Sequence, residues 1–134
     1  MKQYMLDTNT VSYLIQDHPA VARRLVSTPM ASLCISAITE GEILFGLAKR
    51  PHAKELHVAV REFLRRVDVL PWDSIVAERY GTVRATMERQ GKTLAPLDLL
   101  IASQALNAEA VLVTHDRAFS QVSGLHVEDW TAAN

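Results

Sequence analysis

Short apolar runs alternate along the chain with longer segments in which apolar residues recur every three or four positions. The short runs cover residues 3–6, 33–35, 68–70, 110–113 and 125–127. Runs of this length without internal alternation are typical of strands that are buried on both faces. We therefore predict up to five short buried strands.

The intervening segments have the spacing of amphipathic helices. Apolar side chains at 56, 59, 60, 63, 64 and 67 illustrate it. Predicted helices start near Thr8-Asn9-Thr10, which supplies capping side chains, and continue over 21–26, 39–47, 53–67, 74–90 and 98–107. The short helix over 21–26 runs through Val21, Leu25 and Val26. In the helix over 74–90, the inward positions are predicted to be Ile75, Val76, Tyr80, Val83 and Met87.

Strands that alternate with helices imply right-handed crossovers and a parallel sheet with both faces covered. The prediction is a single α/β domain over residues 1–134, a three-layer α/β/α sandwich with a central, mostly parallel sheet of four to five strands. A chain of 134 residues suffices for one such core.

Composition is that of an ordinary soluble globular protein, with 49% hydrophobic and 22% charged residues. The single cysteine, Cys34, allows no internal disulfide and gives no sign of an oxidising compartment. An acid at Asp7 interrupts the N-terminal segment before a signal-peptide core could form, and no apolar run approaches membrane-spanning length. We expect a cytoplasmic protein with no membrane association.

Acidic residues stand at four junctions between an apolar run and a helix: Asp7, Glu42, Asp98 and Asp116. The carboxyl ends of parallel strands line one crevice, so these side chains are expected to meet. Crowded carboxylates are tolerated only if some are protonated or a cation lies among them. A hard divalent ion bound by oxygen atoms, Mg²⁺ or Mn²⁺, is the simplest partner.

Each of these acids also has a purely structural interpretation. Asp7 and Asp98 could cap helices, Glu42 could interact with a helix dipole, and Asp116 could stabilise a turn. His115, beside the last acid, either contacts substrate or is a polar turn residue. The remaining histidines lack the spacing of a zinc site. The sequence also contains no phosphate-binding loop, dinucleotide fingerprint or serine-nucleophile motif.

Charge permits a polyanionic substrate without requiring one. There are 14 basic and 15 acidic residues, so a metal that neutralised the four acids would leave 11 and change the balance from −1 to +3. Basic pairs occur at Arg23-Arg24, Lys49-Arg50 and Arg65-Arg66. Such pairs either bind phosphate or belong to solvated helix faces.

Four segments, in order, resemble the PIN-domain ribonucleases of the VapC toxin type, from bacterial toxin–antitoxin pairs. They are residues 5–9 (Met-Leu-Asp-Thr-Asn), 36–43 (Ser-Ala-Ile-Thr-Glu-Gly-Glu-Ile), 96–102 (Pro-Leu-Asp-Leu-Leu-Ile-Ala) and 112–116 (Leu-Val-Thr-His-Asp) with Phe119. The closing segment, Gly124-Leu125 with Glu128-Asp129-Trp130, is also similar.

The resemblance implies that Asp7, Glu42, Asp98 and Asp116 form an acidic Mg²⁺ site, with Thr114 and Asn9 as orienting groups. It further implies an endoribonuclease that cleaves structured RNA, the anticodon region of initiator tRNA being one candidate target. The implied partners are a second copy of the chain and a VapB-type antitoxin that blocks the crevice. Operator DNA would be contacted only through the antitoxin.

Two other interpretations compete with this one. A phosphotransfer enzyme of the haloacid dehalogenase type needs a second aspartate two residues after the first, and Asn9 stands there. A non-catalytic PIN-like scaffold for protein interactions, in which the acids only cap helices, remains the main alternative.

Overall fold

The computed structural model describes residues 2–132, in which five strands form one sheet. The strands are β1 (Tyr4–Leu6), β2 (Leu33–Ser36), β3 (Asp68–Leu70), β4 (Val111–Val113) and β5 (Val127–Glu128), in the order β3-β2-β1-β4-β5. Every neighbouring pair is parallel, and Met5 on the central strand is paired with both Cys34 and Leu112. The predicted sheet is confirmed, and it is wholly parallel.

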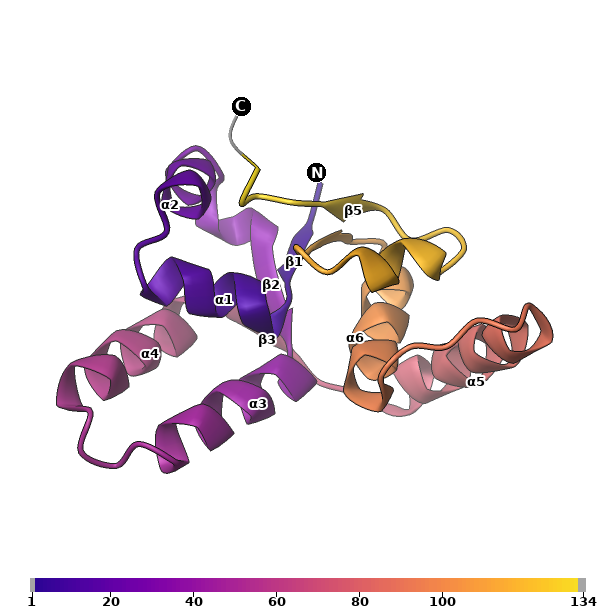
Figure 1. The fold of residues 1–134 in the computed structure, drawn as a ribbon, viewed down its shortest axis with the longest axis horizontal. Coiled ribbons are helices and arrows are strands. Elements are labelled where there is room, and N and C mark those ends of the chain that lie inside the picture. Colours follow the sequence, from indigo (N-terminus) through magenta and orange to yellow (C-terminus); the bar gives the residue numbers. More distant parts are fainter. Residues whose placement is uncertain (1, 133–134) are drawn as a thin grey trace.

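Helices cover both faces of this sheet (Figure 1). They are α1 (Thr8–Ile15), α2 (Pro19–Val26), α3 (Ala37–Ala48), α4 (Lys54–Arg66), α5 (Ser74–Arg89) and α6 (Pro96–Asn107), with short 3-10 turns at η1 (Met30–Ser32) and η2 (Arg117–Gln121). Figure 1 shows α1 to α4 on one side and α5 and α6 on the other. The predicted three-layer α/β/α sandwich is confirmed.

Alternate residues of the central strands enter two separate cores. Met5, Cys34 and Leu112 pack with α5 and α6. Their strand neighbours Leu6, Ile35 and Val113 pack with α1 to α4. Successive strand side chains point to opposite faces, so strands of only three or four residues that are buried on both sides supply both layers.

Several predicted details are wrong. Helix α3 begins at Ala37 rather than near Thr39, because the Ser36 hydroxyl accepts a hydrogen bond from the N–H of Ile38 and caps the helix there. Helix α6 begins at Pro96, a residue suited to the first helical position, rather than at Asp98. Ile75, predicted to face inward, is 66% exposed.

The C-terminal segment closes the α1–α4 side. Trp130 is 1% exposed, and its ring lies 5.5 Å from that of Tyr4. Glu128 accepts hydrogen bonds from Arg24 at 2.9 Å and from the indole N–H at 3.1 Å. No helix within residues 2–132 is long and apolar enough to cross a bilayer.

Candidate active site

The strand order brings the predicted acids to the carboxyl end of the sheet. Asp7 follows β1, the central strand, and Asp116 follows the adjacent β4. Glu42 lies on α3, which continues directly from β2 on the other side of β1. Asp98 lies in the first turn of α6. Residues more than a hundred positions apart therefore share the carboxyl end of the sheet.

Asp7 is buried, at 4% exposure, and has two roles. Its Oδ1 accepts a 2.8 Å hydrogen bond from the N–H of Thr10, so Asp7, and not Thr8, is the N-cap of α1. Burial raises the pKa of its carboxyl, and the nearby charge of Asp116 raises it further. Hydrogen bonds from Thr114 and Thr10 lower that pKa in part. Capping and membership of the acidic site are thus compatible.

The pKa of Asp98 is affected by all three of the other acids. Burial raises the pKa of its carboxyl first, and the charges of Asp116, Glu42 and Asp7 then raise it in that order. Like charges disfavour ionisation only when they are close. One carboxyl therefore interacts with all three of the others.

Glu42 lies in the second turn of α3, and Thr8 holds its side chain. The sequence pattern had indicated only a helix-capping role for Thr8. The Thr8 hydroxyl donates a 2.6 Å hydrogen bond to Glu42 Oε1. This bond joins the first residue of α1 to α3 across 34 positions of sequence. The only sequence signal for it was the position of Thr8 next to Asp7.

Thr114 connects two of the acids. It is 2% exposed, and its hydroxyl hydrogen-bonds the carboxylate of Asp7. The same oxygen accepts a 3.0 Å bond from the N–H of Asp116. Asp116 in turn caps η2, accepting a 2.9 Å bond from the N–H of Ala118. The orienting position implied for Thr114 agrees with these contacts.

Asn9 and His115 take other positions. Asn9 is exposed on the first turn of α1, and its orienting role stays a prediction. His115 Nδ1 lies 2.9 Å from Asp129 Oδ2 and 3.1 Å from the Thr131 hydroxyl. Its ring is therefore engaged with the C-terminal segment, as a polar turn residue would be.

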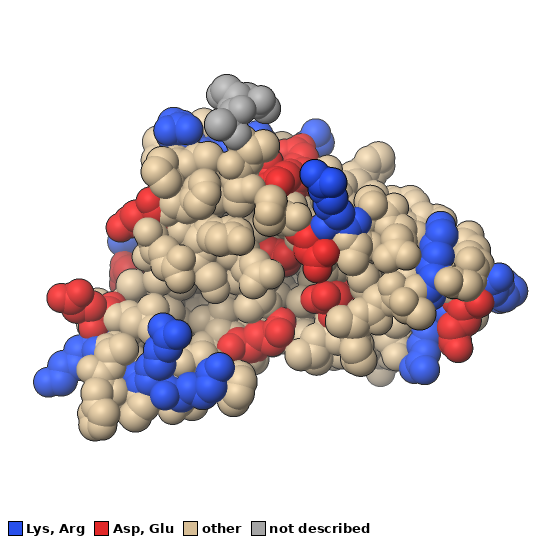
Figure 2. Space-filling model, viewed as in Figure 1, with Lys and Arg blue, Asp and Glu red and all other residues tan. Residues whose placement is uncertain are grey.

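The donor set suits a hard cation that retains water. Figure 2 shows acidic side chains around a hollow at the centre of the molecule. Within residues 2–132, no three acidic, histidine or cysteine side chains are placed to hold one ion between them. Mg²⁺ needs only one or two carboxylates and keeps several waters, so four neighbouring carboxylates fit it with part of the coordination through water.

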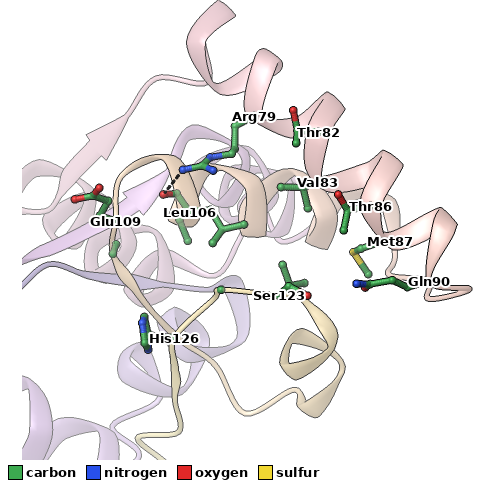
Figure 3. Close-up of a pocket in the computed structure, with 14 residues that line it drawn as sticks. Arg79, Thr82, Val83, Thr86, Met87, Gln90, Leu106, Glu109, Ser123 and His126 are labelled. Atoms are coloured by element: carbon green, nitrogen blue, oxygen red, sulfur yellow. Dashed lines mark hydrogen bonds between the residues drawn. The ribbon is translucent and has the colours of Figure 1, made fainter.

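A separate cavity of about 640 Å³ lies between α5, α6 and the loop before β5 (Figure 3). Arg79 Nη2 there approaches the Leu106 carbonyl oxygen at 3.5 Å, and His126 lies at the opposite side of the view. None of the four acids lines this cavity. This cavity is therefore separate from the acidic site.

Comparisons with known proteins agree with this geometry. The family described as PIN domain matches residues 4–125. The chain is 37% identical over 133 residues to the tRNA(fMet)-specific endonuclease VapC of Shigella flexneri, covering 98% of this chain and 100% of that protein. It is 30% identical to ribonuclease VapC2 of Haemophilus influenzae over 97% of this chain and 99% of that one.

Solved structures show the same relationship. DNA-bound VapBC from Salmonella typhimurium superimposes with a TM-score of 0.89 at 33% identity, over 97% of this chain and 99% of that one. VapBC2 from Rickettsia felis, bound to a fragment of its promoter, gives 0.86 at 30% identity, over 95% and 98%. The chain belongs to the PIN-domain family and, within it, to the VapC proteins.

Proposed function

We propose that this chain is the toxin of a type II toxin–antitoxin system, a metal-dependent endoribonuclease inhibited by a VapB-type antitoxin. The observation that carries the proposal is the placement of four acids at the carboxyl end of the sheet. Asp7 and Asp116 follow the adjacent strands β1 and β4, Glu42 lies on the helix that follows β2, and Asp98 lies in the first turn of α6. Four carboxylates at one sheet edge are costly for a scaffold and useful to a nuclease that binds a cation. The names of the relatives support the same activity.

The residues of the chain prepare the site for a cation. Asp7 and Asp98 are proposed as direct ligands of Mg²⁺, for which Mn²⁺ can substitute, with Glu42 and Asp116 acting directly or through water. When bound, the ion would lower the pKa of a water nucleophile and neutralise charge on the scissile phosphate. Thr114 orients the Asp7 carboxylate and Thr8 orients that of Glu42. Burial raises the pKa of both Asp7 and Asp98, and a bound cation would oppose that shift by favouring the ionised carboxylates.

Structured RNA in the cytoplasm is the proposed substrate, and the anticodon region of initiator tRNA is the specific candidate. Relatives named as tRNA(fMet)-specific endonucleases favour that target. Related complexes named VapBC, two of them bound to DNA, favour an antitoxin partner. We propose that the toxin forms a homodimer and reaches operator DNA only through the antitoxin.

Sequencing of RNA ends after induced expression tests the activity. The intact chain is compared with its Asp7→Asn and Asp98→Asn forms, which should lose cleavage while remaining folded. Glu109→Gln, an exposed acid outside the site, is the matched control. Normal cleavage by a folded Asp7→Asn or Asp98→Asn protein would refute the metal assignment.

A non-catalytic scaffold gives a different result. Titration of the purified, antitoxin-free chain with Mg²⁺ or Mn²⁺ should raise its melting temperature, since a ligand that binds only the native state stabilises it. A scaffold would show no such shift and no RNA cleavage.

A further inference from the structure

A groove of about 210 Å³ runs from the acidic site between α1, α3 and α4. Thr8 and Glu42 belong to the acidic end, and Lys49 and Arg50 belong to the other. Its floor is apolar: Val11, Ile15, Ile43, Leu47, Leu56 and Val60. Glu42 and Lys49 are seven residues apart around α3, about 10 Å along the helix axis. The groove is thus continuous with the candidate active site.

One face of α3 carries an acidic, an aromatic and a basic side chain in succession. Glu42, Phe45, Gly46 and Lys49 stand at i, i+3, i+4 and i+7, the spacing of one helical stripe. Phe45 is 62% exposed, and Lys49 Nζ lies 4.6 Å from the centre of its ring. An exposed ring held against a cation, two turns or less from the acids, is unlike the buried aromatic residues of the two cores.

Gly46 leaves a position without a side chain on this face of α3. A Cβ built there would meet no atom within 4 Å, so packing does not require glycine. Glycine is a poor residue for a helix interior, because its backbone loses more freedom on folding. Because Gly46 lines the groove, the α3 backbone is open to the groove at this position.

The basic end of the groove is available for an anion. Among residues 2–132, neither Lys49 nor Arg50 forms an ion pair. Figure 2 shows basic side chains beside the acidic hollow on the same face of the molecule. Paired positive charges close to a cation-binding nuclease site complement a phosphodiester chain.

We propose that this groove holds the substrate RNA beside the cleavage site, with Lys49 and Arg50 contacting backbone phosphates. Phe45, which is exposed on α3 next to the groove residue Gly46 and does not itself line the groove, stacks on an unpaired base. The assignment rests on the proposed ribonuclease function. Single-stranded nucleic acid is bound by this combination, a positively charged track with an aromatic platform. Splayed loop bases of a folded RNA offer the flat face that an exposed ring needs.

An apolar segment of a partner protein is the other class of molecule that the floor could accept. The exposed Phe45–Lys49 pair favours RNA, and so does the lack of an ion pair at Lys49 and Arg50 within residues 2–132, because a purely apolar helix would leave both cations without an anionic partner. Binding measurements separate the two.

The test measures binding of bulk tRNA to the Asp98→Asn protein and cleavage by the otherwise intact enzyme. Phe45→Ala and Lys49→Ala should each raise Kd and KM about tenfold with little change in kcat, the signature of a lost binding contact. Lys49→Ala should also reduce the slope of log K against log salt concentration by about 0.7 to 1, and Phe45→Ala should not. Lys49→Arg should restore binding.

Two exposed residues provide matched controls. Lys54→Ala removes a nearby cation outside the groove, and Val58→Ala removes an apolar side chain, 70% exposed, from α4. Both should leave Kd, KM and the salt slope unchanged. Melting temperatures of all variants verify that they fold.

The outcomes are distinguishable. Failure of the intact chain to cleave any RNA would overturn the proposed function, and the groove assignment with it. Normal cleavage, with Kd and KM unaffected by Phe45→Ala and Lys49→Ala, would overturn the groove assignment alone. If these variants instead weaken only the binding of the purified antitoxin, the groove is a protein-docking site and the RNA assignment is wrong.

Discussion

The hydroxyl of Thr8 donates a 2.6 Å hydrogen bond to Oε1 of Glu42. Both residues are partly buried, and they come from different helices. The bond restricts Glu42 to one orientation at the edge of the acidic site. It also leaves the second carboxylate oxygen available to a cation or its bound water.

Removal of that hydroxyl should impair the enzyme more than it destabilises the fold. We expect Thr8→Val to reduce RNA cleavage 10- to 100-fold, as is typical when a group that orients a metal ligand is lost. The free energy of unfolding should fall by about 1 kcal/mol, the net value of one hydrogen bond. Cleavage rates at increasing Mg²⁺ concentration give the effect. Thr8→Ser keeps the donor and should retain activity, and equal losses in the two variants would contradict the orienting role.

The stability of the metal-free protein should depend on the proton affinity of Asp98. Its native pKa is raised above the 3.8 of the unfolded chain, so the native state binds a proton more tightly. The contribution of Asp98 to stability should therefore increase as pH falls from neutral through its native pKa, and this gain should level off below 3.8. Below that value both states are protonated.

Asp98→Asn mimics the neutral carboxyl and tests this relationship. In buffer containing a chelator at neutral pH, the variant should unfold with a free energy about 1 kcal/mol higher than that of the intact chain. Its stability should also depend less steeply on pH. Denaturant unfolding at a series of pH values measures both, and an unchanged pH slope would show that Asp98 does not sense its acidic neighbours.

Cys34 should be inert towards thiol reagents in the native protein. Burial, and then the charge of Asp68, raises the pKa of its thiol to about 12, so almost no reactive thiolate exists at neutral pH. Iodoacetamide should modify it at the rate of global unfolding, with fast reaction in denaturant as the control. Rapid labelling without denaturant would mean that β2 opens locally.

The C-terminal segment should contribute strongly to stability through Trp130. Replacing this 1% exposed residue with alanine should cost about 3–5 kcal/mol, because the cavity between Tyr4 and Arg24 remains partly empty. Trp130→Phe retains an aromatic ring and loses the hydrogen bond to Glu128, so its cost should be smaller. Urea unfolding compares the two variants. Equal destabilisation would indicate that the hydrogen bond, rather than packing, holds the segment.

Local pattern was sufficient to predict the elements and their layers. The period of a helix is set by the backbone itself, so apolar spacing predicted long helices such as α4, whereas the three-residue strand β3 is too short to show a period and was the least secure of the predicted strands. Parallel strands all have their carboxyl ends on the same side of the sheet, which is why Asp7 and Asp116 could be expected to lie close together there. Helix starts were less well predicted: α3 and α6 each begin two residues before the predicted position, because the capping role of Ser36 and the first-turn position of Pro96 were not recognised.

What the sequence by itself determined is therefore the order of strands and helices, the two-sided burial of the sheet and the gathering of acids at its edge. Tertiary structure alone decided that Thr8 reaches Glu42, that Thr114 lies between Asp7 and Asp116, and that Val26 and Ile75 face solvent. The physical reason is that sequence patterns describe interactions within one element, between residues that are close along the chain. A hydrophobic period describes one element, whereas contact between side chains on different elements depends on how those elements pack.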